Sequence, residues 1–418
     1  MNSRPSIVSR RDFVRASAAA GAVITAFPHI VLGAEPDKLL KIGLVGCGGR
    51  GVGAAHNAMA ADPNVKVTAL ADMFAERVED AAQLLKKNTG IDIAPDHRFV
   101  GEDAYRKLLE TDVDIVILAT PPYFRPKHFE ACINANKHVF MEKPVAVDPV
   151  GARSIMATGR KADEKKLVVV AGTQRRHQLS YIETIRRIHD GAIGRIVSAQ
   201  VYWNGGMAKY YLRKEGWSDM EWMLRDWFNW TWLSGDHIVE QHMHNIDVAN
   251  WVIGTHPIKA HAMGGRHRRI TGDQYDFFCT DFTYPGEVHV ASQCRQIHGC
   301  KTEVAERVIG EKGYSNCDGF ISTIGELDFE KRPNKDAYVQ EHRDMIRAIR
   351  NGERLNEAQA VAESTLSAIM ARMSAYTGQE VTWDEVMKSD LVLSPPDYEL
   401  TEENIRAHIP VPGAPRSA

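Results

Sequence analysis

A short apolar run followed directly by a glycine-rich turn constrains the fold of this chain more than any other feature. The run LLKIGLV covers 39–45, the turn GCGGRG covers 46–51, and an alanine-rich helical segment follows over 54–61. A second apolar run, VKVTALAD, ends in Asp72. The order strand, glycine turn, helix and strand predicts the first unit of a doubly wound parallel sheet in an α/β protein.

The glycines of this turn fit a phosphate-binding role. Gly46 allows a tight turn, Gly48 lets the backbone approach a pyrophosphate, and Gly51 permits close packing of helix on strand. Asp72 stands about twenty residues further on, where a carboxylate accepts both hydroxyls of an adenosine ribose. The pattern therefore predicts a dinucleotide site, and the alternative is a glycine turn that binds nothing.

Asp72 also bears on the choice of cofactor. A carboxylate at that position repels a 2′-phosphate, and Met73 and Phe74 place no cation next to it. The sequence therefore favours NAD, while Arg50 and Arg77 keep NADP open as the less favoured alternative.

Three later apolar runs predict further parallel strands: VDIVILAT, KHVFM and KLVVVAG, at 113–120, 137–141 and 166–172. Lys143 follows the second run and precedes Pro144, so its backbone is held extended. Because ligands bind at the carboxyl ends of parallel strands, Lys143 is expected where a nicotinamide would lie.

The segments GCGGRG, ATPPYFRPKH and ANKHVFMEKPVA, with a later HNID, resemble the glucose-fructose oxidoreductase, inositol dehydrogenase and MocA family (Gfo/Idh/MocA). The resemblance covers nearly all of the chain after its first forty residues. It implies a second α+β lobe with an open, mainly antiparallel sheet, an active site between the lobes, and pairing of subunits into a homodimer or homotetramer. It also implies that Lys143 contacts both cofactor and substrate.

The expected cofactor site combines the glycine turn with the ends of the later strands. Its residues are Gly46, Gly48, Gly49, Arg50, Gly51, Asp72, Thr120, Pro121, Pro122, His128, Glu142, Lys143 and Gln174.

Alignment by HxxD places the family's catalytic histidine at His244 and its acid at Glu240, where an aspartate is usual. Residues four apart share a helical face, and His237 and Asp247 extend the same stripe at either end. We expect His244 to act as the general base, Glu240 to set its tautomer, and Lys143 to polarise the hydroxyl or carbonyl oxygen.

Two other interpretations of this helix stay open. The imidazoles and carboxylates can form a hydrogen-bonded structural cluster. Alternatively, His237, Glu240 and His244 can bind a divalent metal from one helical face, although the HExxH spacing is absent.

Six of the eight tryptophans lie between 203 and 232. Indole rings stack on the C–H faces of sugars and donate to hydroxyls, so this segment is predicted to form a carbohydrate-binding loop or lid. The alternative is that several of the rings belong to the core or to a subunit contact. The expected substrate contacts are Arg175, His177, Trp227, Trp230, Asp236, His237 and Asp247.

Composition excludes several classes of protein. The 418 residues are 44% hydrophobic and 25% charged, as in folded proteins of more than one domain. A net charge of −3 provides no basic field for nucleic acid, which favours a small-molecule partner. The tryptophans and the family resemblance make a sugar, glycoside or cyclitol the expected one. The six cysteines lack CxxC spacing and are expected to be free, with a Cys294–Cys300 bridge as the open alternative.

The segment SRRDFVR at 9–15, with the alanine-rich stretch after it, resembles a twin-arginine export signal. The stretch is too short and weakly apolar for a membrane span. We expect a periplasmic or extracytoplasmic protein without membrane contact after cleavage; an N-terminal arm or packed helix is the alternative. The expected parts are the signal at 1–34, a Rossmann domain at 35–172, a substrate and oligomerisation domain at 173–395 and a tail at 396–418, with helices at 341–378 able to pack back on the Rossmann domain.

These features predict an oxidoreductase that moves a hydride between tightly bound NAD and a secondary hydroxyl of a sugar, glycoside or cyclitol. The main alternative is a glycoside hydrolase or epimerase that works by transient oxidation, as in the NAD-dependent α-N-acetylgalactosaminidases of similar fold. A sugar- or nucleotide-binding protein without turnover is the least favoured, because it leaves Lys143 and His244 without a role.

Overall fold

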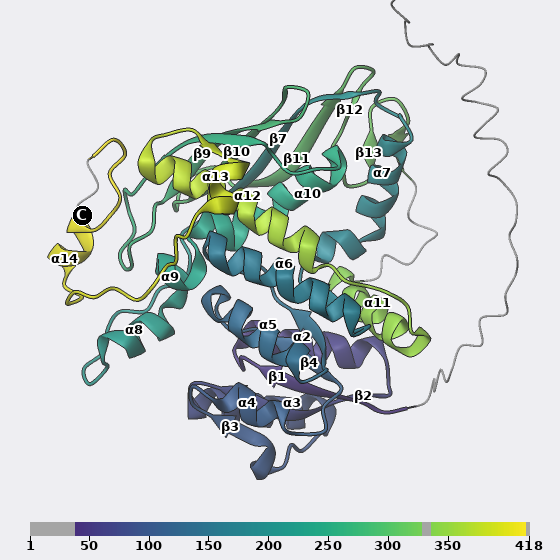
Figure 1. The fold of residues 1–418 in the computed structure, drawn as a ribbon, viewed down its shortest axis with the longest axis vertical. Helices are drawn as coiled ribbons and strands as arrows, with labels where there is room; N and C mark the ends of the chain where they lie inside the picture. Colours follow the sequence, from purple (N-terminus) through teal and green to yellow (C-terminus); the bar gives the residue numbers. More distant parts are fainter. Residues whose placement is uncertain (1–37, 328–335, 415–418) are drawn as a thin grey trace, which may run out of the picture. The chain divides into compact units, whose positions relative to one another are not determined.

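The structure is a computed structural model that describes residues 38–327 and 336–414. The predicted export signal at 1–34 lies outside these residues. Two β-sheets and the helices around them make up the described chain (Figure 1). Within the described residues, no helix is both long and apolar enough to cross a membrane.

The first sheet has six parallel strands in the order β3-β2-β1-β4-β5-β6, which confirms the doubly wound topology. Its strands are β1 (Leu40–Val45), β2 (Val65–Asp72), β3 (Arg98–Val100), β4 (Ile115–Leu118), β5 (His138–Met141) and β6 (Val169–Ala171). Its helices are α2 (Gly49–Ala61), α3 (Ala75–Thr89), α4 (Ala104–Leu109), α5 (Arg125–Asn134) and α6 (Pro149–Glu164). Every residue of β4 and β6 is buried, as expected for parallel strands covered on both faces.

The second sheet has nine strands in the order β14-β13-β12-β11-β7-β10-β9-β8-β15 and is mainly antiparallel, with β7 and β10 paired in parallel. Its longer strands are β7 (Ile196–Gly205), β8 (Lys259–Gly265), β9 (Phe277–Tyr284), β10 (Val288–Gln296) and β11 (Glu303–Gly310). Its short strands are β12 (Tyr314–Ser315), β13 (Phe320–Ile321), β14 (Gly325–Glu326) and β15 (Val381–Thr382).

One face of this second sheet is buried and the other is open. Phe278, Phe282 and Val290 point into the core, while Met263 and Phe277 stay exposed on the other face. The alternation along β9 and β10 produces this division, because successive side chains of a strand point to opposite faces.

The closing helices α11 (Ala337–Asn351) and α12 (Ala358–Thr377) connect the two sheets. α11 packs against α2, and its Met345 and Ile346 join the core beside β1. α12 packs against both α6 and β8 and lies between the sheets in Figure 1. The remaining helices are α7 (Leu179–His189), α8 (Asp219–Arg225), α9 (Thr231–Ser234), α10 (Met243–Ile253), α13 (Trp383–Lys388) and α14 (Glu402–Ala407).

Three of the six clustered tryptophans form a small core of their own. Trp222, Trp230 and Trp232 are buried, and Leu400 and Ile405 of the C-terminal tail pack against them. The core interpretation therefore holds for these three rings, and the expected substrate contact of Trp230 is wrong because its side chain is wholly enclosed.

Several histidines are buried where their charged form is disfavoured. Burial lowers the pKa values of His128, His242 and His342 from 6.5 to about 3. His177 behaves differently: although burial opposes its charge, hydrogen bonds from its ring to the carboxylates of Asp344 and Glu357 raise its pKa to about 10.

The close approach of α2 to the glycine turn predicts how two glycine substitutions will differ. A Cβ on Gly51 would lie 1.9 Å from the carbonyl oxygen of Gly46, whereas one on Gly53 meets only the end of the Arg50 side chain, at 3.8 Å. We expect Gly51→Ala to lower the free energy of unfolding by about 3 kcal/mol or more. Gly53→Ala should raise it by up to about 1 kcal/mol, since alanine favours a helix. Urea denaturation measures both, and equal effects would contradict the close approach.

The buried histidines predict a loss of stability in acid. In the unfolded chain, His128, His242 and His342 bind protons below pH 6.5, whereas in the folded chain they bind protons only near pH 3. Between these values the unfolded chain binds more protons, so the free energy of unfolding falls as the pH drops. His177 adds stability that is full below pH 6.5 and is lost as the pH rises toward 10. His342→Gln should therefore show a shallower fall between pH 6.5 and pH 4 than the parent in urea denaturation. Identical slopes would show that His342 does not stay neutral.

Candidate active site

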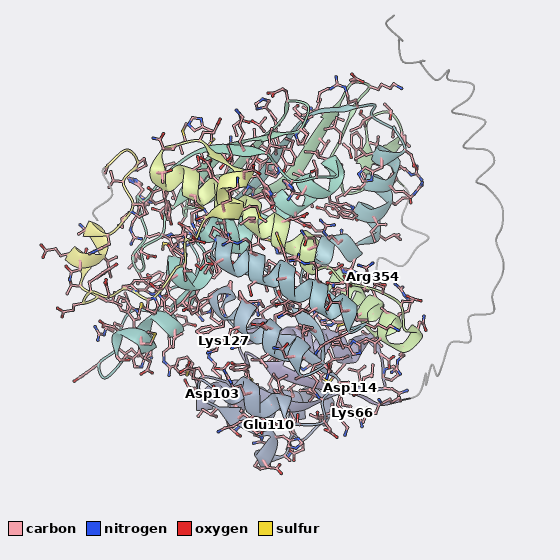
Figure 2. The ribbon with its side chains drawn as sticks, in the orientation of Figure 1. Lys66, Asp103, Glu110, Asp114, Lys127 and Arg354 are labelled. Carbon is pink, nitrogen blue, oxygen red and sulfur yellow. The ribbon has the colours of Figure 1, made fainter. Side chains whose placement is uncertain are left out.

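A cavity of about 860 Å³ lies at the carboxyl ends of β1, β2 and β4. Gly46, Asp72 and Thr120 line it from the Rossmann domain, and Trp203 and Gln296 line it from the second sheet. Figure 2 shows Lys127 and Asp103, which follow strands, on the side of the Rossmann domain toward α8. Lys66 and Asp114, which lie at the starts of β2 and β4, are on the opposite side. The cavity is thus at the edge where doubly wound sheets bind ligands.

The backbone around the glycine turn fits the pyrophosphate of a dinucleotide. Gly46 has a φ of 98°, and a Cβ there would lie 2.6 Å from the backbone of Ala119. Cβ atoms on Gly48 and Gly49 would meet nothing within 4 Å, so both residues leave room for a ligand. No side chain caps the N-terminus of α2 and its first turn carries no acid, so its amides are free to meet an anion.

Asp72 stands at the end of β2 in the cavity wall, as predicted. Its Oδ2 accepts a hydrogen bond from the Cys47 amide at 2.7 Å, and its Oδ1 accepts one from the Phe74 amide at 3.0 Å. Burial raises the pKa of Asp72, and these two donors oppose that rise by stabilising the carboxylate. The carboxylate is held in place with acceptor capacity left for ribose hydroxyls.

Arg50 lines the cavity and is paired with two carboxylates. Its Nε donates to Glu142 at 2.5 Å, its Nη2 donates to Glu341 at 3.4 Å, and its guanidinium lies 4.9 Å from the ring centre of Tyr338. These contacts change the expected role of Glu142, whose carboxylate fixes Arg50 and does not line the cavity.

Lys143 is joined to the second lobe through Glu240. Its Nζ donates to the Glu240 backbone carbonyl and to Glu240 Oε1, the latter at 3.3 Å. Only 10% of the Lys143 side chain and 9% of the Glu240 side chain are exposed. Burial raises the pKa of Glu240, and the ammonium of Lys143 counteracts this. The other carboxylate oxygen of Glu240 accepts from Gln241.

The expected role of Glu240 as the partner of His244 is therefore wrong. The physical reason is a π-helical turn at Ile238–His242, directly before α10. A π turn has more residues per turn than an α-helix, so the four-residue spacing no longer places these two side chains together.

The predicted stripe of four ionisable side chains is broken for the same reason. His237 Nδ1 lies 3.0 Å from Asp236 Oδ1, and both side chains are fully enclosed. Asp247 accepts three hydrogen bonds from Arg176, at 2.8, 2.9 and 3.2 Å. Asp236, His237 and Asp247 are thus structural and not the substrate contacts that the sequence predicted.

The structure does not bring the three residues of the metal interpretation together. Among the described residues, no three or more His, Cys, Asp or Glu side chains are grouped so that they could hold an ion. His237 is committed to Asp236, and Glu240 to Lys143, so His244 is left without fellow ligands.

His244 occupies a buried position against an indole. Its ring stacks on Trp203, with ring centres 5.6 Å apart and planes 19° apart, and it forms no hydrogen bond with any described residue. Burial lowers the pKa of His244 well below 6.5, and the positive charges of Lys143 and Arg175 add to the effect. The imidazole is neutral near pH 7 and can accept a proton.

The other predicted substrate contacts divide into two groups. Arg175 donates to Glu306 at 2.5 Å and lies 6.0 Å from the ring centre of Trp203, near His244. Trp227 lines the cavity. His177, by contrast, is held between Asp344 and Glu357, at 2.8 and 3.1 Å, so its expected contact with substrate is wrong.

Most of the predicted cofactor residues line the cavity: Gly46, Gly48, Gly49, Arg50, Gly51, Asp72, Thr120, Pro121 and His128. Pro122, Glu142, Lys143 and Gln174 do not, and Gln174 donates instead to Tyr338 at 3.3 Å. Sequence reasoning missed Gln241 and Gln296, since an amide inside a helix or strand carries no motif. All six cysteines are free, which rules out the Cys294–Cys300 bridge in this structure.

Two curated relatives match part of this chain. Inositol 2-dehydrogenase of Rhodococcus jostii is 32% identical over 162 residues, which cover 38% of this chain and 40% of that protein. A glycosyl hydrolase family 109 protein of Streptomyces coelicolor is 28% identical over 156 residues, which cover 37% of this chain and 32% of that protein. The matched region thus spans well under half of the length of either relative.

The fold has counterparts among solved structures. Scyllo-inositol dehydrogenase of Lactobacillus casei, solved with bound NAD(H) and scyllo-inositol, superposes with a TM-score of 0.63 at 21% identity. The match covers 82% of this chain and 99% of that one.

Two family models match most of the described chain. Residues 40–172 match an oxidoreductase family with an NAD-binding Rossmann fold, GFO/IDH/MocA, and residues 181–315 match the C-terminal domain of the same family. With the strand order and the glycine turn, these matches show that the chain belongs to the Gfo/Idh/MocA oxidoreductase family and that its Rossmann domain binds NAD.

Proposed function

We propose that this protein is an NAD-dependent oxidoreductase that moves a hydride between NAD and a secondary hydroxyl of a cyclitol, sugar or glycoside. One observation carries the proposal: a dinucleotide cavity ending in Asp72 at one side also contains Trp203, against which the neutral, buried His244 is stacked. The likeness to inositol 2-dehydrogenase supports a polyol as the substrate class.

The chain's own residues perform the proton chemistry. The glycine turn and Asp72 would hold NAD, which would supply the hydride acceptor. His244 accepts the hydroxyl proton, because burial and the nearby positive charges keep its imidazole neutral. Lys143 donates a hydrogen bond to the substrate oxygen, and its ion pair with Glu240 keeps its ammonium in a fixed place.

The substrate end of the cavity suits a neutral polyol. Trp203 offers an indole face, and Gln241 and Gln296 offer amides that can both donate to and accept from hydroxyl groups. Arg175, whose guanidinium lies 6.0 Å from the ring centre of Trp203, is neutralised by Glu306. An indole face and two amides suit a substrate that is recognised through its hydroxyl groups.

A glycoside hydrolase or epimerase that oxidises its substrate transiently is the second candidate. Its support is the 28% identity to a glycosyl hydrolase family 109 protein. The same His244 and Lys143 would serve it, because the oxidised sugar must be reduced again in the same site. The two candidates differ in whether reduced cofactor remains after each turnover.

Two further proposals concern the whole protein. The SRRDFVR segment supports export by the twin-arginine route and a periplasmic or other extracytoplasmic location.

The open face of the second sheet, with exposed Met263 and Phe277, supports a homodimer or homotetramer joined through that face.

Replacing the two proton-handling residues tests the proposal. We expect Lys143→Ala and His244→Ala to lower turnover by about a hundredfold or more, the loss typical of a missing acid-base group. The measurement is the rate of NAD reduction with a panel of inositols, sugars and glycosides. Lys161→Ala is the matched control, since Lys161 is an exposed lysine of the same domain and forms a surface ion pair with Glu130 at 3.1 Å. Circular dichroism confirms that each variant is folded.

Two outcomes would contradict the proposal in different ways. Near-normal turnover in both variants would remove Lys143 and His244 from the chemistry. Release of an aglycone from a glycoside, with no reduced cofactor left over, would favour the hydrolase candidate instead.

A further inference from the structure

The cavity wall opposite the glycine turn comes largely from one segment, residues 206–229, between β7 and α9. Lys209 and Tyr211 contribute from its first half, and Leu224, Arg225 and Trp227 from its second half. These residues face the same space as Asp72 and Phe74. The segment predicted to bind carbohydrate thus covers the part of the cavity where Asp72 would hold an adenosine ribose.

Internal contacts make this segment a defined structure. The buried carboxylate of Asp226 accepts from the Tyr211 amide at 2.7 Å and from Asn229 Nδ2 at 2.8 Å. The Trp222 indole donates to the Tyr211 carbonyl at 2.7 Å. Trp222 itself packs in the buried cluster with Trp230, so the segment is anchored in the second lobe.

The side chain of Arg225 connects this segment to the Rossmann domain. Arg225 Nη1 lies 2.6 Å from Glu76 Oε1 in the first turn of α3. The Arg225 guanidinium also lies 4.0 Å from the ring centre of Phe74, two residues beyond Asp72. Glu221 Oε1 accepts from Arg225 Nε at 2.8 Å and orients the guanidinium from within the segment.

We propose that residues 206–229 form a clasp over the adenosine end of bound NAD, and that the Arg225–Glu76 ion pair is its latch. The inference rests on the proposed NAD-dependent function, because Asp72 fixes which end of the cofactor lies beneath the clasp. Phe74 lies two residues after Asp72, so the two side chains are close to the same part of the cavity. The Arg225 guanidinium, which lies over the Phe74 ring, therefore restricts the path by which NAD leaves beside the ribose site. NAD must wait for the latch to open before it leaves.

The Arg225–Glu76 ion pair is accessible to solvent, unlike the buried contacts that anchor the segment. The side chain of Glu76 is 53% exposed and that of Arg225 is 19% exposed. Ion pairs that solvent reaches weaken as salt screens them, whereas packing contacts do not. Release of NAD should therefore speed up with ionic strength.

The test measures how fast NAD leaves the full-length protein. Each variant is saturated with NAD, diluted rapidly and passed through a desalting column at intervals, and the retained nucleotide is measured by chromatography. We expect release to be about threefold faster in Glu76→Gln and about tenfold faster in Arg225→Ala, which also loses the contact with Phe74. The double variant should be no faster than Arg225→Ala alone, since both changes break one contact.

Glu79→Gln is the matched control. Glu79 lies on the same helix, is 51% exposed, and forms its ion pair with Arg98 inside the Rossmann domain at 2.9 Å. Its release rate should equal that of the parent. In addition, raising salt to about 1 M should speed release from the parent but not from Glu76→Gln.

The outcomes separate the clasp from the proposed function. If the parent and all variants bind NAD and release it at one rate, the clasp is overturned while the NAD-dependent function stands. If the parent retains no NAD under any condition, both fail, because the cavity then does not hold the cofactor. Because Glu76 is an exposed carboxylate of the Rossmann domain, Glu76→Gln keeps the test valid even if Arg225→Ala fails to fold.

Discussion

The buried ion pair between Lys143 and Glu240 is the contact on which the rest of the site depends. It joins the end of β5 in the Rossmann domain to the π turn that opens α10 in the second lobe. Removing one partner of such a pair leaves an uncompensated buried charge, which typically costs about 3–5 kcal/mol. The two lobes are thus fixed to each other at the place where cofactor and substrate must meet, and the neutral state of His244 follows partly from the ammonium that the pair brings near it.

Three arginines of the two lobes are each paired with a carboxylate. Arg50 is neutralised by Glu142 and Glu341, Arg175 by Glu306, and Arg176 by Asp247. Each of these arginines therefore has a partner before any ligand arrives. The substrate end of the cavity offers the amides of Gln241 and Gln296 and the indole of Trp203, on which the neutral imidazole of His244 is stacked. Amides and an indole can recognise hydroxyl groups, which supports the proposed polyol substrate.

The sequence predicted the Rossmann half well because its signals are local. The glycine turn, Asp72 and the apolar strands follow each other within the chain, and the sheet order and the carboxyl-edge cavity confirm them.

The catalytic helix was predicted less well, because its placement depended on α-helical periodicity and Ile238–His242 is a π turn. Sequence reasoning was also wrong at His177, His237 and Trp230. Each residue type suits a sugar site, but all three side chains are buried, and His177 is paired with Asp344, far away in the chain. Residues 206–229 are tied to the Rossmann domain by the contact between Arg225 and Glu76. These two residues are 149 positions apart in the chain, so no local sequence pattern reveals the contact.

The most direct measurement follows the hydride itself. The protein is incubated with NAD and an inositol that carries deuterium on each ring carbon, and the nicotinamide of the recovered cofactor is analysed by mass spectrometry. Hydride transfer from a secondary alcohol carbon predicts deuterium in the reduced nicotinamide, in an amount that matches the ketone formed. Turnover of the inositol with no deuterium in the cofactor would contradict an NAD-dependent oxidoreductase and would require a different role for the site around Lys143 and His244.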